Sequence, residues 1–363
     1  MIKAVHISRY RGIRELVADG FGRVNLVIGR NDCGKTAFLE ALQLADDAED
    51  AAHRMLATQR GRLRRAVKSH DFDRFWRPMF SDLRADFGLS IWIARQGGAR
   101  QVLAMRQASI SEAIISDRGG QRNMYGGGGH DHGSSEILTS STWALDLQLT
   151  VYDKAQIQQQ IVGSPTDLKL PPPSGKNRSA WITSGAGVSE ADIKFVSALK
   201  QRGQEGTLVE LLREVDDRVS GVELLAPGGD VAELFVRLDN GTPMLPVALM
   251  GEGFQRCLEL GSAAAAHDWP TLFIDEIENG MHHTVMEPLW RWIAAVSSRR
   301  DSQVFATTHS EECIHAACRA FQGLDDDGLR VIRLDRLESG TRATVYDRTL
   351  VETAERTGTE IRG

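Results

Sequence analysis

The hydrophobic pattern at the start of the chain predicts strand, loop and helix in that order. Residues 1–16 alternate apolar and polar positions and turn near Tyr10–Arg14, which predicts a strand at the edge of a sheet. Residues 23–28 form an apolar run typical of a buried strand, and residues 37–45 have helical spacing. A glycine-rich loop separates that strand from that helix.

The middle of the chain mixes strand-like runs with flexible segments. Residues 87–93 and 143–149 are β-like, and four consecutive glycines near residues 125–135 predict a mobile loop. A proline-rich segment at about 163–187 is predicted to form a second flexible connection. A helix is predicted from about 189 to 219, with a candidate break near Gly203–Gly206.

Alternation returns in the last third of the chain. Short hairpin strands are predicted first, followed by an apolar helix, two buried strands, a further helix and two late strands. Their ranges are 221–225, 232–236, 245–247, a helix opening at 249–256 and running to 266, 270–276, 302–309, a helix to about 321, 329–334 and 343–346.

Composition narrows the class of protein. The 363 residues fit one large domain with an insertion or two modest domains, and a net charge of −6 means that a nucleic-acid contact would need a local basic patch. Four scattered cysteines without a C-x-x-C pair indicate reduced thiols. The N-terminus lacks a signal-peptide pattern, and no apolar run approaches the roughly 20 residues of a membrane helix. We therefore expect a cytoplasmic protein with no membrane partner.

The glycine-rich loop carries the clearest chemistry. It reads Gly29-Arg30-Asn31-Asp32-Cys33-Gly34-Lys35-Thr36, the Gly-x-x-x-x-Gly-Lys-Thr pattern of a phosphate-binding loop between strand and helix. Its glycines let backbone N–H groups form a nest for phosphates, and we count Asn31, Asp32 and Cys33 with Gly29 and Gly34 as nucleotide-binding. Lys35 is predicted to reach the β- and γ-phosphates and to assist catalysis, and the Thr36 hydroxyl to bind Mg²⁺.

A second cluster lies at the ends of two later strands. Asp275 and Glu276 follow an apolar strand, at the edge where α/β folds bind ligands. Asp275 suits a Mg²⁺ ligand, and Glu276 suits the base that orients or deprotonates the attacking water. His309 ends the next buried strand and could hydrogen-bond that water or the γ-phosphate.

Gly251 and Gly253 lie at the start of the apolar helix that runs to about residue 266. Backbone N–H groups at a helix N-terminus form an anion site. Because one phosphate-binding loop does not need a second such site in the same chain, we expect these glycines to serve a nucleotide bound by another protomer.

Three other features have competing interpretations. Residues 54–68 contain six basic side chains and no acids, which fits a phosphate backbone, a solvated helix face or an acidic partner. These are Arg54, Arg60, Arg62, Arg64, Arg65 and Lys68. His130 and His132 could bind metal but are better explained as solvated loop residues, as are Asp325–Asp327.

Taken together, the motifs resemble those of ABC-type ATPases of the RecF, SMC and OLD (overcoming lysogenisation defect) group, and most of all its short, stand-alone bacterial members. The matching segments are Tyr10-Arg11-Gly12-Ile13 for the opening Phe-Arg-Gly-Ile, 29–36 for Walker A, 251–256 for the signature, Asp275-Glu276 for Walker B, 278–282 for the D-loop and His309 for the switch histidine. The signature usually has Ser where this chain has Gly251, and no glutamine can be assigned to the Q-loop.

The resemblance implies an α/β fold of the ABC-ATPase head type. It predicts a mixed or parallel sheet flanked by helices, an antiparallel β subdomain and an inserted middle region. The expected division is 1–50 and 221–363 for the ATPase core and 51–220 for the insertion, with loops near 120–135 and 163–187. The resemblance also places Arg11 among the nucleotide-binding residues.

The resemblance further implies ATP and Mg²⁺ as cofactors, and two heads that close face to face as a dimer or higher even oligomer. The long coiled coils of SMC proteins and the Toprim nuclease domain of OLD nucleases are not visible in this sequence. We therefore expect a conformational switch that controls a separate effector, a nuclease or toxin, in anti-phage defence. The alternatives are a RecF-like repair ATPase that binds double-stranded DNA, and an ATP-binding scaffold or inhibitor with little turnover.

Overall fold

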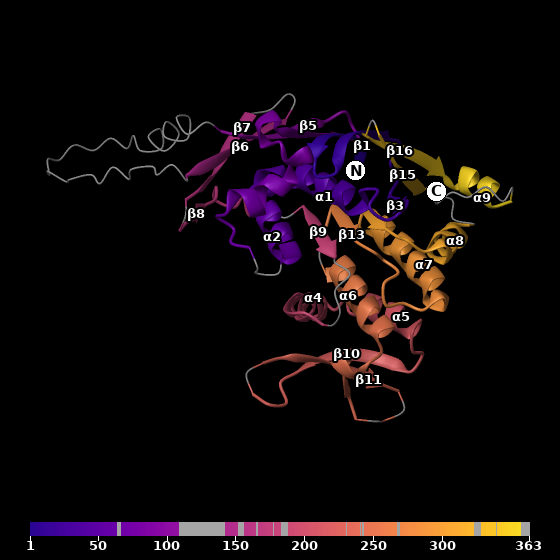
Figure 1. Cartoon of the computed structure of the whole chain (residues 1–363). Helices are drawn as coiled ribbons and strands as arrows, with labels where there is room; N and C mark the ends of the chain where they lie inside the picture. The colour runs from indigo at the N-terminus through magenta and orange to yellow at the C-terminus, as the bar shows by residue number, and fades with distance from the viewer. Residues whose placement is uncertain are drawn as a thin grey trace, which may run out of the picture. The chain divides into compact units, whose positions relative to one another are not determined.

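The chain divides into two compact units, which are described separately (Figure 1). Unit 1 comprises residues 1–4, 17–39 and 177–363, and unit 2 comprises 5–16 and 40–176. The computed structural model describes residues 1–63, 67–108, 142–151, 156–164, 166–176, 178–182, 188–229, 231–239, 241, 243–266, 269–322, 328–338 and 340–356. The predictions for the glycine loop with His130 and His132, for Arg64 and Arg65 and for Asp325–Asp327 lie outside these residues. The predicted domain boundaries after residues 50 and 220 stay a prediction.

Unit 1 is built on a six-stranded sheet with the order β16-β15-β3-β14-β13-β9. Neighbouring strands run parallel except β15 and β16, which form an antiparallel hairpin. The strands are β3 (Val24–Ile28), β9 (Ser179–Ile182), β13 (Thr271–Ile274), β14 (Gln303–Thr307), β15 (Leu329–Leu337) and β16 (Gly340–Asp347). All five residues of β3 are buried, as expected of a run that is apolar at all positions but one and has a neighbour on each side.

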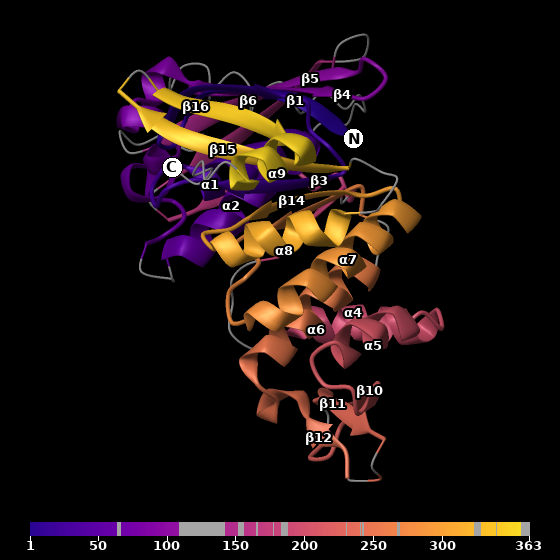
Figure 2. The same ribbon diagram turned by 90° about the vertical axis from the view of Figure 1, so that its right-hand side faces the viewer.

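Helices and a small antiparallel sheet complete unit 1. Figure 2 shows α7 and α8 beside the six-stranded sheet, with the three-stranded sheet β10-β11-β12 at the far end of the helices. These elements are α4 (Glu190–Gln201), α5 (Gly206–Arg213), β10 (Val219–Leu225), β11 (Glu233–Leu238), β12 (Leu245–Pro246), α6 (Glu252–Ala266), α7 (His283–Arg299), α8 (Glu311–Phe321) and α9 (Arg348–Arg356). A local sequence signal sets the start of α4: the Ser189 and Asp192 side chains form a capping box there.

Unit 2 contains most of a seven-stranded sheet with the order β2-β1-β4-β5-β6-β7-β8. The strands from β4 to β8 are joined in antiparallel pairs. The elements are β1 (Ile2–Tyr10), β2 (Ile13–Asp19), α2 (Ala51–Leu63), β4 (Leu89–Arg95), β5 (Arg100–Gln107), β6 (Trp143–Val151), β7 (Gln156–Gly163) and β8 (Leu168–Lys169). The boundary between the units falls within α1 (Lys35–Asp46).

The fold class predicted from the sequence is confirmed. The chain has a mixed, largely parallel sheet with helices and also contains an antiparallel β region. Of the helices among the described residues, none has the length and apolar character that a membrane span requires.

Three local predictions were wrong. The segment at 163–187 is not only a connection, because it contains β8 and β9, and β9 pairs with β13. The helix predicted to end near residue 219 ends at Arg213, and Val219 already begins β10. Strands β5 and β7 were missed because their sequences, RQVLAMRQ and QIQQQIVG, are mostly polar. A sheet that keeps one face in solvent tolerates such strands, since main-chain pairing and one apolar face suffice.

Two buried amides tie the strands of unit 1 together at their amino ends. The Asn25 side chain accepts from Gly22 N at 2.8 Å and donates to Gly22 O and Val304 O. The Gln303 side chain accepts from Ile2 N at 2.7 Å and donates to Ile2 O and Gly22 O. Both side chains are fully buried, so each bond replaces a solvent contact that the backbone has lost.

Replacing Gln303 with alanine is expected to lower the free energy of unfolding by about 2–4 kcal/mol. The substitution leaves buried main-chain groups of Ile2 and Gly22 without hydrogen-bond partners and creates a cavity. Urea denaturation checks this value. The control is Gln201→Ala at the exposed end of α4, which should change stability by less than about 0.5 kcal/mol. Equal losses in the two variants would contradict the role given to Gln303.

Candidate nucleotide-binding site

The glycine-rich loop leaves the carboxyl end of β3 and runs beside the end of β15. Ile28 is paired with Arg333, so the later residues of β15 extend past β3 and along the loop. Gly29 has φ +140°, and a Cβ there would lie 2.4 Å from Leu334 O and 2.8 Å from Cys33 Sγ. Only glycine fits this position, for both steric and conformational reasons.

Lys35 and Thr36 begin α1 and point in different directions. The Lys35 side chain is 5% exposed and its Nζ donates to Gly29 O at 2.7 Å and to Arg30 O at 2.9 Å. The Thr36 hydroxyl donates to Asp275 Oδ1 at 3.1 Å. Burial raises the pKa of the Cys33 thiol, an effect that Lys35 opposes, so Cys33 is a neutral thiol near pH 7.

A buried threonine joins the ends of β13 and β14. The Thr307 hydroxyl donates to Asp275 Oδ1 at 2.7 Å and accepts from Glu276 N at 2.8 Å. Thr36 and Thr307 therefore meet on one carboxylate oxygen, and Thr307 also holds the main chain of the next residue. The two strand ends and the start of α1 form one hydrogen-bonded cluster.

Glu276 occupies a strained backbone position next to this cluster. Its φ is +50°, a region that costs a non-glycine residue about 1–3 kcal/mol and is concentrated at functional sites. Its Oε1 lies 3.6 Å from His309 Nε2. The Glu278 carboxylate accepts from His309 N at 2.5 Å, which connects the D-loop segment to the histidine.

The helix that begins at the two signature glycines is connected to the same strand end. Arg256 is 4% exposed and donates to Asp275 O at 3.1 Å and to Glu276 O at 3.3 Å. It also pairs with Glu259 at 2.6 Å, whose pKa is raised by burial and lowered in turn by this arginine. Gly251 and Gly253 flank the first residue of α6, and a Cβ on Gly253 would lie 3.3 Å from Gly280 O of the D-loop.

Arg11 belongs to unit 2 and is held there by a buried polar network. Its Nε lies 2.6 Å from Glu40 Oε2, and its guanidinium also donates to Gln59 Oε1 and Tyr10 Oη. Burial raises the pKa of Tyr10, so the phenol stays neutral. A nucleotide contact by Arg11 stays a prediction.

Part of the basic run on α2 is committed to ion pairs within unit 2. Arg54 lies 2.8 Å from Asp47, and Arg62 lies 2.5 Å from Glu40. Arg60 donates to the Ser69 hydroxyl at 3.5 Å. These ion pairs fit a structural role for Arg54 and Arg62 better than an open phosphate-binding face.

The donor set suits a magnesium nucleotide. The Thr36 hydroxyl and the Asp275 carboxylate are hard oxygen ligands of the kind that Mg²⁺ prefers, and the ion usually completes its shell with phosphate oxygens and water. Within the described ranges, no three His, Cys, Asp or Glu side chains gather to hold a metal by themselves. The residues present therefore fit a Mg²⁺ ion that is bound together with the phosphates of a nucleotide. Lys35 supplies a positive charge beside those phosphates.

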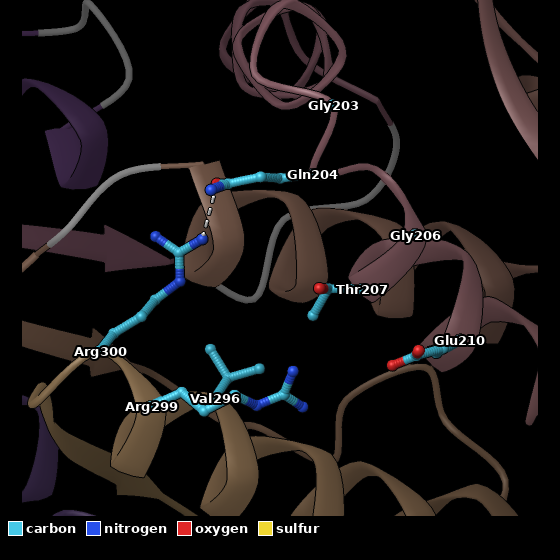
Figure 3. A pocket seen from close by; sticks show the side chains of 8 residues that line it. All are labelled: Gly203, Gln204, Gly206, Thr207, Glu210, Val296, Arg299 and Arg300. Atoms are coloured by element: carbon cyan, nitrogen blue, oxygen red, sulfur yellow. Dashed lines mark hydrogen bonds between the residues drawn. The ribbon is translucent and has the colours of Figure 1, made fainter.

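A separate cavity of about 710 Å³ lies in unit 1, at the C-terminal end of α7 and the N-terminal end of α5 (Figure 3). Arg300 donates to Gln204 Oε1 at 3.2 Å across it. Its other lining residues are Gly203, Gly206, Thr207, Glu210, Val296 and Arg299. None of the residues predicted for the nucleotide site lines this cavity.

Three residues of the cluster had no assigned role in the sequence analysis. Thr307 is signalled by the Thr-Thr-His sequence that ends a buried strand, and Glu278 and Arg256 were placed in motifs without a function of their own. Their contacts are made to main-chain atoms of residues distant in sequence, and a motif does not reveal such contacts.

The strand order is that of an ABC-type ATPase head. The chain is similar to a solved SMC head bound to the C-terminal winged-helix domain of ScpA, with a TM-score of 0.50, 12% identity and coverage of 98% of this chain and 99% of that chain. This likeness establishes the fold.

Sequence comparisons agree with this class. Residues 157–314 match a family model described as an AAA domain, putative AbiEii toxin, type IV toxin–antitoxin system. An "ATP/GTP phosphatase" of Helicobacter pylori is 23% identical over 345 residues, which cover 86% of each chain. An uncharacterised protein of Methanocaldococcus jannaschii is 42% identical over 50 residues, which cover 14% of this chain and 23% of that protein. The resemblance to an ATPase of the ABC and AAA class is thus confirmed.

Replacing Thr307 with valine, which keeps the shape but removes the hydroxyl, is expected to lower ATP turnover at least tenfold. It removes one of the hydroxyl donors to Asp275 and leaves the Glu276 N–H without its acceptor, a loss of about 1–3 kcal/mol in the folded state. Phosphate release at saturating ATP, well below the unfolding temperature, measures the effect. Thr307→Ser retains the hydroxyl and should retain most activity; a serine variant as impaired as the valine variant would argue against the hydrogen bonds as the cause.

Proposed function

We propose that this protein is a Mg²⁺-dependent ATPase whose heads pair face to face around bound ATP and act as a conformational switch for a separate effector. The observation that carries the proposal is the hydrogen-bonded cluster in which Thr36, Asp275 and Thr307 share one carboxylate oxygen. It joins the phosphate-binding loop to the carboxylates that an ATPase needs, with Glu276 and His309 alongside.

Each residue then has a defined task. The loop amides and Lys35 bind phosphates, and Thr36 with Asp275 holds Mg²⁺, which would neutralise charge on the phosphates. Glu276 orients and deprotonates the attacking water, and His309 hydrogen-bonds the water or the γ-phosphate. Thr307 is a positioning residue, because it fixes Asp275 and the main chain of Glu276 without reaching the substrate.

Completion of the site by a second copy is part of the proposal. Gly251 and Gly253 present the N-terminus of α6, a 15-residue helix, which favours an anion such as the γ-phosphate held by the facing head. Arg256 connects that helix to the main chain of Asp275 and Glu276 in its own head. When the signature of one head binds the nucleotide of the other, the effect would be transmitted through Arg256 to Glu276 of the head that carries the signature.

The comparisons support the wider role. The relative named as an ATP/GTP phosphatase supports nucleotide hydrolysis. The matching family is described as an AAA domain, putative AbiEii toxin, of a type IV toxin–antitoxin system, which supports a function connected with a toxin. In the superposed SMC structure a head is bound to a separate protein, ScpA, which shows that this fold can carry a partner.

The Lys35→Ala and Glu276→Gln variants separate binding from hydrolysis. Lys35→Ala should lose nucleotide binding by at least a hundredfold, while Glu276→Gln should bind ATP, release phosphate at least a hundredfold more slowly and double in mass with Mg-ATP in light scattering. Exposed Lys194→Ala and Glu210→Gln are the matched controls. Rapid hydrolysis by Glu276→Gln would remove the assigned base. A mass that ATP leaves unchanged would remove the nucleotide-dependent dimer.

A negative charge introduced at Gly251 of the signature motif tests the proposed contact between two heads. A Cβ at Gly251 meets no atom within 4 Å, so Gly251→Asp fits the folded monomer but opposes a phosphate brought by the other head. In the Glu276→Gln background it should abolish ATP-dependent doubling and leave ATP affinity within about threefold. Gly228→Asp, at another open position in unit 1, is the control. Undiminished doubling by the Gly251 variant would mean that the heads meet through a different surface.

A further inference from the structure

The phosphate-binding loop contains an acidic residue, Asp32, beside its phosphate-binding amides. The Asp32 backbone is left-handed, with φ +63°, and its side chain is 93% exposed. A nest of amides at a helix N-terminus attracts anions, whereas a carboxylate within it repels them. The negative charge of Asp32 therefore opposes the binding of a triphosphate unless another group compensates it.

Arg336 supplies that compensation from the far end of the sequence. It lies near the end of β15, past the residues that pair with β3, and its NH1 is 2.9 Å from Asp32 Oδ2 and 3.5 Å from Asp32 O. The arginine is therefore directed at the loop itself, at both the side chain and the main chain of Asp32.

The pair has little to do with stability of the fold. Both side chains are largely exposed, at 63% and 93%, and exposed ion pairs stabilise proteins very little. Aspartate also adopts the left-handed region more readily than most residues, so the loop conformation does not require the arginine. The main effect of this ion pair is therefore on the electrostatic potential at the phosphate-binding loop.

We propose that Arg336 is a nucleotide-positioning residue, which neutralises Asp32 and so removes the repulsion that this carboxylate would exert on a triphosphate in the loop. The inference rests on the proposed function, because it assumes that the loop binds a nucleotide. It adds to the nucleotide site a residue about 300 positions distant from the Walker A motif, on an element to which no motif assigns a role.

The hairpin offers a matched control. Arg342 of β16 is 60% exposed, close to the 63% of Arg336, but it pairs with Asp335 at 3.3 Å and not with the loop. Arg336→Ala and Arg342→Ala therefore remove the same charge from the same hairpin. Only the first leaves Asp32 uncompensated.

Calorimetric titration of Mg-ATP into the full chain, in the Glu276→Gln background so that ATP persists, tests the proposal. At low ionic strength Arg336→Ala should weaken ATP binding about tenfold, and Arg342→Ala less than twofold. The tenfold difference should shrink to about threefold or less at 0.5 M salt, because exposed charges are screened. Equal affinities of the Arg336 and Arg342 variants would overturn the proposal.

A double variant separates charge compensation from a structural role in the loop. Asp32→Asn combined with Arg336→Ala should bind ATP within about threefold of the parent protein, because the repelling charge is gone. If Arg336 only held the loop in shape, the double variant would bind as weakly as Arg336→Ala, and that result would overturn the proposal. Failure of the parent protein itself to bind ATP would instead count against the proposed function.

Discussion

Parallel pairing of β13, β14 and β3 is the constraint on which the site depends. Because all three strands run the same way, their carboxyl ends meet at one edge of the sheet, and the residues that follow them are brought together. The ladder continues past the strands through main-chain bonds from Thr308 N to Val27 O and from Ile277 N to Thr307 O. Backbone hydrogen bonds thus set the spacing of the phosphate-binding loop, the two carboxylates and the histidine. Substitution of a single side chain would change this spacing only slightly.

Within that frame, the finer geometry depends on a few buried polar contacts. One hydroxyl, that of Thr307, sets both a carboxylate and the amide of the next residue. Arg256 donates to the carbonyls of the same two residues. A left-handed Glu276 persists because these contacts over-determine its backbone, so strain at the carboxylate is offset by hydrogen bonds around it.

The sequence was sufficient to predict the elements that carry strong local signals. An apolar strand followed by Gly-x-x-x-x-Gly-Lys-Thr, and another followed by Asp275-Glu276, predicted the central strands and the fold class correctly. Polar strands such as β7, and the four-residue β9, were missed because pairing with β6 and β13 stabilises them more than their own composition does. The contacts of Thr307, Arg256 and Arg336 were invisible for a related reason: each joins residues far apart in sequence, and periodicity describes only near neighbours.

The position of β3 in the sheet has a consequence for folding during synthesis on the ribosome. Both of its neighbours, β14 and β15, are translated about 280 to 305 residues later. At about 5–20 residues per second, the segment Val24–Ile28 waits tens of seconds before it can find a partner. During that interval the nascent chain exposes an unpaired, apolar strand edge, the type of segment that aggregates most readily. Late pairing of β3 during synthesis therefore follows from the same strand order that creates the nucleotide site.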